Sequence, residues 1–243
     1  MSWTDLSPKG TSLANQTTDA RGLFSITGIT GKRLGVGDLE KAGYVAARGT
    51  NPYTFEYPGF WEPSYHIPDP ENPVIFRMHR RGEAEPLTYR RKTFFDARAD
   101  GVPTHYNFAQ WKEVPSGGDL TVRISRGPRE NRRFAWEADV EVPGGGLIES
   151  SEEFMVEAPD EGYLPRWSFA QTGSELHFLN DVHRTFYFRS RDGKFGRLYV
   201  RLLPRYNEGA KVDLELYLNP SGSRNLEIDP TKVVEITPES LMR

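Results

Sequence analysis

The chain contains no cysteine among its 243 residues, so disulfide bonds and metal sites built on thiolates are excluded. An excess of charge of one sign is also missing, because 31 basic residues stand against 34 acidic ones and the formal net charge is −3. Without a strong field of one sign, the composition gives no indication of binding to nucleic acid or to an anionic membrane surface.

Long hydrophobic runs are absent as well. No segment approaches the roughly 20 consecutive apolar residues that a membrane-spanning helix needs, so we expect no membrane insertion by this chain. Residues 1–5 lack the basic segment and apolar stretch of a signal peptide. Apolar residues still make up 37% of the chain, which together with its glycines is enough for a folded core.

Helix signals are nearly missing. Only residues 37–48 have a helix-like composition, and Gly43 interrupts them. Short β-branched or aromatic runs, separated by Gly, Pro, Asn and Asp, occur instead along the whole chain. This spacing predicts an all-β protein with little or no helix, whose main part is a larger antiparallel β-sandwich or jelly-roll-like domain.

The segment 184–220 carries the clearest strand pattern, because apolar residues alternate with polar ones in three successive runs. Turn signals at 192–194 and 207–209 separate the runs and predict a three-stranded meander. In the expected register Arg201 lies opposite Glu215. The polar face of this sheet is either a binding surface or ordinary solvent-facing sheet, and it carries Tyr187, Tyr199, Tyr217, Arg197 and Arg201.

Seven further strands are expected outside the meander. They lie at 74–79, 87–95, 104–111, 120–125, 134–142, 167–171 and 232–236. The segment 152–164 is acidic and contains Pro159, so we expect an irregular, solvated loop there. Basic clusters at 79–81, 90–92 and 129–133 are interpreted as charges at strand ends and sheet edges.

Residues 51–73 stand apart, because six of these 23 residues are prolines. Proline removes a backbone donor and favours extended geometry, so this segment is the expected junction between a front module, 1–50, and a β domain of unknown function, 74–243. The junction is also rich in aromatic residues. They form either a platform for stacking sugar rings or a plug between two sandwiches, and the candidate ligand-binding residues are Tyr57, Phe60, Trp61 and Tyr65.

The front module has a pattern of turns and strands. The residues that carry the pattern are Thr18-Asp19, Gly22, Phe24, Gly28-Ile29, Gly31 and Gly43-Tyr44, and Asp19 to Gly22 is read as a tight turn. The pattern resembles the carboxypeptidase regulatory-like domain and covers residues 1–50. The resemblance implies a small immunoglobulin- or prealbumin-like β-sandwich of the kind appended to exported proteins.

The front module departs from that family in one respect. The usual first half is missing, and only residues 2–6 could represent a strand from it. A sandwich without an edge strand exposes unpaired backbone, so we expect an N-terminally truncated module that begins inside a longer protein. The resemblance then implies an extracytoplasmic location, with any export signal lying upstream.

Residues that often carry catalysis form no recognised pattern. The five histidines lack the His-x-x-x-His spacing, and His177 with His183 is read either as a metal pair or as structural or surface residues. No Gly-x-Ser-x-Gly sequence occurs. The loop 220–225 offers hydroxyl groups either to its own backbone or to a bound phosphate or carboxylate. We therefore expect no catalytic residue, no metal ion and no cofactor.

These observations lead to three functional hypotheses. The first is a non-catalytic binding or spacer module of an exported bacterial-type protein, with a surface glycan (carbohydrate binding) or another protein domain as partner. The second is a carboxylate-dependent hydrolase of the glycoside type, which needs two acidic side chains at a defined separation in one cleft of the β domain. The third is a purely structural domain without a ligand.

Overall fold

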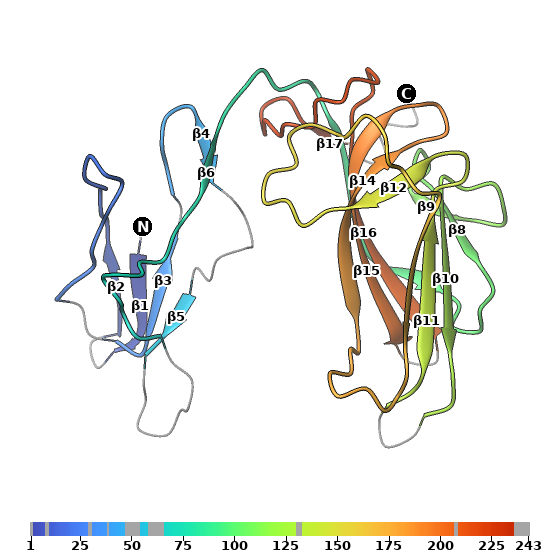
Figure 1. Ribbon diagram of the computed structural model, residues 1–243, viewed down its shortest axis with the longest axis horizontal. Helices are drawn as coiled ribbons and strands as arrows, with labels where there is room; N and C mark the ends of the chain where they lie inside the picture. Colours follow the sequence, from blue (N-terminus) through green and yellow to red (C-terminus); the bar gives the residue numbers. More distant parts are fainter. Residues whose placement is uncertain are drawn as a thin grey trace. The chain divides into compact units, whose positions relative to one another are not determined.

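The computed structural model describes residues 2–7, 10–28, 31–37, 39–46, 54–57, 66–129, 133–206 and 209–235. The chain forms two compact units, Met1–Arg81 and Gly82–Arg243 (Figure 1). Every regular element within the described ranges is a β-strand, which confirms the predicted all-β class. No described segment is a helix that could cross a membrane.

The first unit is built on a four-stranded antiparallel sheet with the order β2-β1-β3-β5. Its strands are β1 (Ser2–Ser7), β2 (Gly10–Ala14), β3 (Arg33–Val36) and β5 (Thr54–Glu56). A further pair joins β4 (Tyr44–Ala46) to β6 (Met78–Arg80). The helix-like segment 37–48 therefore contains a strand, and residues 78–80, expected in the larger domain, pair within the first unit. The junction at 51–73 stays a prediction, because only 54–57 and 66–73 of it are described.

The predicted tight turn at the front of the chain is present. The Oδ1 atom of Asp19 accepts the backbone N–H groups of Arg21 at 2.8 Å and of Leu23 at 2.9 Å. Gly22 has φ = +80°, a conformation that favours glycine. The turn is therefore confirmed, whereas the family resemblance built on it stays a prediction.

The second unit consists of two sheets that face each other (Figure 1). The six-stranded sheet contains, in spatial order, β12 (Gly146–Glu149), β14 (Val182–Arg189), β15 (Phe195–Tyr206), β16 (Gly209–Leu218), β7 (Thr88–Ala97) and β17 (Val234–Glu235). The five-stranded sheet contains β13 (Arg166–Gln171), β11 (Trp136–Glu141), β10 (Leu120–Arg126), β8 (Thr104–Asn107) and β9 (Lys112–Val114). All strand pairs are antiparallel except β17 with β7.

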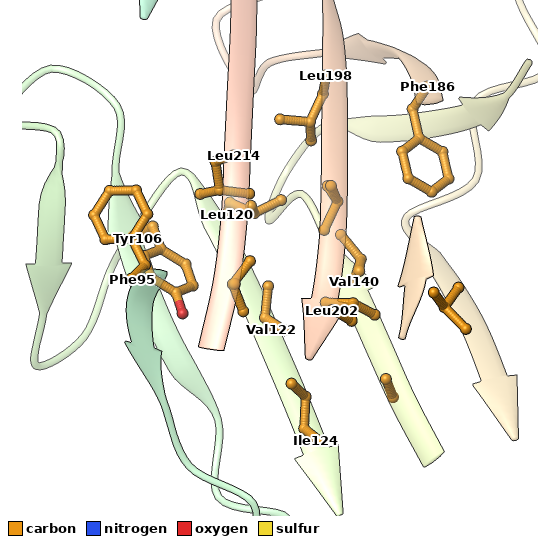
Figure 2. Close-up of a cluster of buried hydrophobic side chains, with 14 of the residues drawn as sticks. Phe95, Tyr106, Leu120, Val122, Ile124, Val140, Phe186, Leu198, Leu202 and Leu214 are labelled. Carbon is orange, nitrogen blue, oxygen red and sulfur yellow. The ribbon is translucent and has the colours of Figure 1, made fainter. Parts of the chain in front are cut away.

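The core of the second unit lies between the inner faces of these sheets. Figure 2 shows inner-face side chains of the two layers turned toward each other, and Leu198 and Leu214 of one sheet belong to the same buried cluster as Leu120 and Val122 of the other. Each of these four side chains is at most 1% exposed. Two packed antiparallel sheets with one shared apolar core form a β-sandwich, as predicted.

The predicted meander is present as β14, β15 and β16, but its second register is wrong. Gly193 has φ = +79° in the first turn, as expected for a glycine in the left-handed position. In the second hairpin Arg201 lies opposite Asp213 rather than Glu215. The pairing shifts by one residue at an irregularity between Leu203 and Tyr206. The observed partner of Arg201 lies two residues from the expected one, so the side chains of the meander keep their predicted faces.

Part of the outer face of the six-stranded sheet is covered. The segment 152–164 is irregular and most of its acidic side chains are exposed, as expected, but its apolar residues pack on this sheet. Tyr187 is only 1% exposed and belongs to a second apolar cluster with Met155, Ala158 and Leu226. The hydroxyl group of Tyr187 donates to Glu152 Oε2 at 2.7 Å. The segments around 152–164 and 219–228 therefore cover part of the face that the sequence suggested as a binding surface.

The buried cluster predicts a large difference between two leucine substitutions. Leu198 is 0% exposed, whereas Leu176 is 85% exposed. We expect Leu198→Ala to lower the free energy of unfolding by about 2–5 kcal/mol, because it leaves a cavity between the sheets. The control Leu176→Ala should change it by less than about 0.5 kcal/mol. Urea unfolding of both variants measures the difference, and equal effects would contradict the placement of Leu198 in the core.

Candidate functional site

Of the four aromatic residues proposed from the sequence as ligand-binding, the structure describes Tyr57 alone. Phe60, Trp61 and Tyr65 lie outside the described residues. Tyr57 is half-buried, and its ring meets His66 edge-on with 6.1 Å between the ring centroids. Burial raises the pKa of its hydroxyl group. A sugar-stacking platform at these positions therefore stays a prediction.

The histidine pair offers no metal centre in the described part of the chain. There, no three His, Asp or Glu side chains gather closely enough to hold a metal ion. His183 is exposed, and its ring stacks on that of Tyr199 with 6.3 Å between the centroids. This contact supports the surface interpretation of His183.

The serine-rich loop after β16 does bind a carboxylate, but it is one of the chain's own. Asn219 Nδ2 donates to Glu85 Oε2 at 3.0 Å, and Ser221 Oγ donates to the same oxygen at 2.9 Å. Hydrogen bonds from Asn219, Ser223 and Ser221 hold the pKa of Glu85 below its ordinary value. Glu85 thus occupies the anion-binding position that the sequence suggested in this loop.

A pocket that the sequence did not reveal lies at one end of the second unit. Its volume is about 300 Å³, which is at the lower limit for small-molecule sites. Residues from both sheets line it, so it opens where the two layers of the sandwich end. The residues that line the pocket are Thr88, Arg90, Phe108, Ala109, Asp119, Val142, Pro143, Phe188, Ser190, Arg191, Asp192, Lys194, Leu216 and Leu218.

The inner part of the pocket is apolar. Phe108, which follows β8 of one sheet, meets Phe188 at the end of β14 of the other, and the ring centroids are 5.8 Å apart in an edge-to-face arrangement. Leu216, Leu218 and Val142 add aliphatic surface. This lining favours the apolar body of a ligand.

Ion pairs hold the rim of the pocket. Arg191 Nη2 lies 2.9 Å from Asp119 Oδ1, which joins the β14–β15 turn of one sheet to the start of β10 in the other. Asp119 Oδ2 also accepts the backbone N–H group of Phe108 at 2.8 Å. Within the turn, Lys194 Nζ lies 3.0 Å from Asp192 Oδ2. Each of the two rim cations therefore has a carboxylate partner.

Arg90 is the exception in the pocket, because its guanidinium group is buried without a carboxylate. The residue lies opposite Leu216 on the inner face of the sheet and is only 4% exposed. Its Nη2 atom donates to the carbonyl oxygen of Ala109 at 2.9 Å, and Cζ lies 5.9 Å from the ring centroid of Trp111. No Asp or Glu among the described residues forms an ion pair with it, and burial lowers the pKa of the guanidinium group.

The loop between β8 and β9, residues 108–111, covers Arg90. Its turn is closed by Asn107 Oδ1, which accepts the backbone N–H group of Gln110 at 2.7 Å. Trp111 has φ = +52°, which is strained for a residue with a large side chain. Its indole N–H group is buried and has no hydrogen-bond partner in the described structure. The contacts of Arg90 therefore belong to a loop that is itself under strain.

Sequence reasoning missed Arg90 because of a bulge in β7. Arg90 and Phe95 face the same core although they are five residues apart, and simple alternation would place them on opposite faces. The pairing of β7 with β16 is irregular between Val212 and Leu214, and Phe94 there has φ = +58°. The cluster 90–92 was therefore interpreted as edge charge, and no signal in the sequence marks the bulge.

Comparison with known proteins found no relative of this chain. A scan against models of protein families gave no match, and searches of curated proteins and of solved structures gave none either. The fold and the pocket are therefore described from the chain alone.

The hydrogen bonds that Glu85 accepts predict a pH dependence of stability. Because the folded pKa is below the ordinary value, the stabilisation is fully present above about pH 4.3 and is lost as the pH falls through the lower folded value. Glu85→Gln should therefore weaken the acid-induced drop in the urea midpoint between pH 5 and pH 3 of the native chain. The control is Glu83→Gln, at a neighbouring exposed residue. An identical acid profile for Glu85→Gln and the native chain would show that the loop does not hold this carboxylate.

Proposed function

We propose that this chain is a non-catalytic binding module and that its ligand occupies the pocket at the end of the second unit. One observation carries the proposal: an apolar cavity of about 300 Å³ opens between the two sheets. Ion pairs at its rim fix the turn that borders it, so the site needs little rearrangement to accept a ligand. A preformed site loses less conformational entropy on binding.

The same proposal places the module in an exported bacterial-type protein and identifies its front as carboxypeptidase regulatory-like. The turn at Asp19, with its two backbone N–H groups bound to one carboxylate oxygen and Gly22 at φ = +80°, supports this part. A surface glycan held by the aromatic segment 57–65 remains the alternative ligand for the front of the chain.

The carboxylates of the pocket support binding rather than hydrolysis. Asp119 and Asp192 both line the pocket, as a glycosidase pair would. Asp119 is held by Arg191 and by the backbone of Phe108, and Asp192 by Lys194. Hydrogen bonds from Ser190 and Lys194 lower the pKa of Asp192, whereas a general acid needs a raised one.

A substitution that fills the pocket tests this function. We expect both 1-octanol and octanoate to shift the backbone amide resonances of Phe108, Phe188 and Lys194 in the ¹⁵N-labelled chain, because these residues line the cavity. Thr88→Phe places a ring in the cavity and should weaken binding of either probe by about tenfold or more, because the ring takes the volume that the probe would occupy; a tenfold loss corresponds to about 1.4 kcal/mol of binding free energy.

The control is Thr93→Phe, at an exposed position of the same strand. It should bind both probes as the native chain does. If neither probe shifts these resonances, or if Thr88→Phe binds both as well as Thr93→Phe does, the pocket is not the binding site.

A further inference from the structure

The charge of Arg90, which no carboxylate compensates, indicates what kind of ligand the pocket binds. A guanidinium group removed from water is strongly disfavoured unless an anion or several hydrogen-bond acceptors replace the lost hydration. Arg90 has one acceptor, the carbonyl oxygen of Ala109, together with the face of Trp111. This set is incomplete for a group with five N–H donors.

The remaining donors of Arg90 are within reach of the pocket. Its Nε and Nη1 atoms have no partner in the described structure. They are also not fully enclosed, in contrast to the orphaned Nε atoms of Arg197 and Nε1 of Trp111. Arg90 is one of the residues that line the cavity. Nη2 carries two hydrogens, and one of them bonds the carbonyl oxygen of Ala109. The other forms, with the neighbouring N–H of either Nε or Nη1, a two-donor edge that matches the two oxygens of a carboxylate.

The charged residues that line the pocket favour a ligand with one negative charge. Three cations line the pocket, Arg90, Arg191 and Lys194, against two carboxylates, Asp119 and Asp192. The two rim cations are already paired, so one positive charge remains. A monoanion neutralises it, whereas a phosphate dianion would leave an unbalanced negative charge in an apolar site.

We infer that the ligand is a small monocarboxylate with an apolar body, its carboxylate bound by Arg90 and its body held by Phe108, Phe188 and Leu216. This inference rests on the proposed function, because it names the ligand class of the same pocket. The alternative is that Arg90 is structural, with Ala109 and Trp111 as sufficient partners. The two roles differ in what happens when the charge is removed.

Charge selectivity of the native chain is the first test. Isothermal titration calorimetry with octanoate, 1-octanol and octyl phosphate compares a monoanion, a neutral molecule and a dianion of the same chain length. We expect octanoate to bind about tenfold or more tightly than 1-octanol, since a hydrogen bond to a charged group contributes about that factor. We also expect octanoate to bind more tightly than octyl phosphate and to lose its advantage below the pKa of the acid.

The variant Arg90→Met is the second test. It should lower the affinity for octanoate by about tenfold to a hundredfold, leave that for 1-octanol unchanged, and leave the melting temperature unchanged or raised, because an apolar side chain suits this site. Arg91→Met is the matched control: Arg91 is the next residue of β7, and its exposed side chain pairs with Glu215 at 3.6 Å. It should bind all three probes as the native chain does.

The outcomes distinguish a failure of the carboxylate inference from a failure of the proposed binding pocket. Equal binding of octanoate and 1-octanol overturns the carboxylate inference and leaves the binding pocket standing, whereas no binding of any probe overturns both. Tighter binding of octyl phosphate overturns the choice of a monocarboxylate. A lower melting temperature of Arg90→Met with unchanged octanoate preference would assign Arg90 a structural role, and if that variant fails to fold, the comparison of probes on the native chain decides alone.

Discussion

The packing of the two inner faces in the second unit is the constraint on which the rest of this structure depends. Leu198 and Leu214 of one sheet and Leu120 and Val122 of the other are almost completely buried in one cluster. This packing is continuous through the middle of the sandwich, and it stops where the strands run into turns. The pocket lies at such an end, so its apolar lining is the last layer of the core, open on one side.

The bulge in β7 links this core to the site. Asp213, only 8% exposed, accepts the backbone N–H group of Phe94 at 2.7 Å and stabilises the irregular step. The bulge changes the phase of the strand, so both Phe95 and Arg90 face the core. Further along the same strand, the N–H group of Asp96 donates to Glu113 Oε1 at 3.1 Å, which satisfies a backbone donor on that side.

The alternation of apolar and polar residues in the sequence was sufficient to predict the β-sandwich. It was not sufficient to predict the residues of the pocket. The period of two placed Leu198, Leu214 and Leu216 inside, because one face of a strand must be apolar wherever a second sheet covers it. It did not reveal the irregularity before Tyr206, nor the segment that buries Tyr187, since both depend on long-range contacts. Arg90 was missed for the same reason: its inward direction follows from a backbone step that no residue type in 90–95 marks.

Two unfavourable features meet at this end of the sandwich, and together they support a role for it beyond folding. Arg90 occupies a position opposite Leu216 where a leucine or methionine would avoid the desolvation of a charge. Trp111 beside it combines a positive φ with a buried N–H group that has no partner. Both destabilise the free chain, and strain or unpaired polar groups of this kind gather at functional sites. A bound anion would compensate the charge of Arg90, so the ligand itself would supply the stability that this end of the fold lacks.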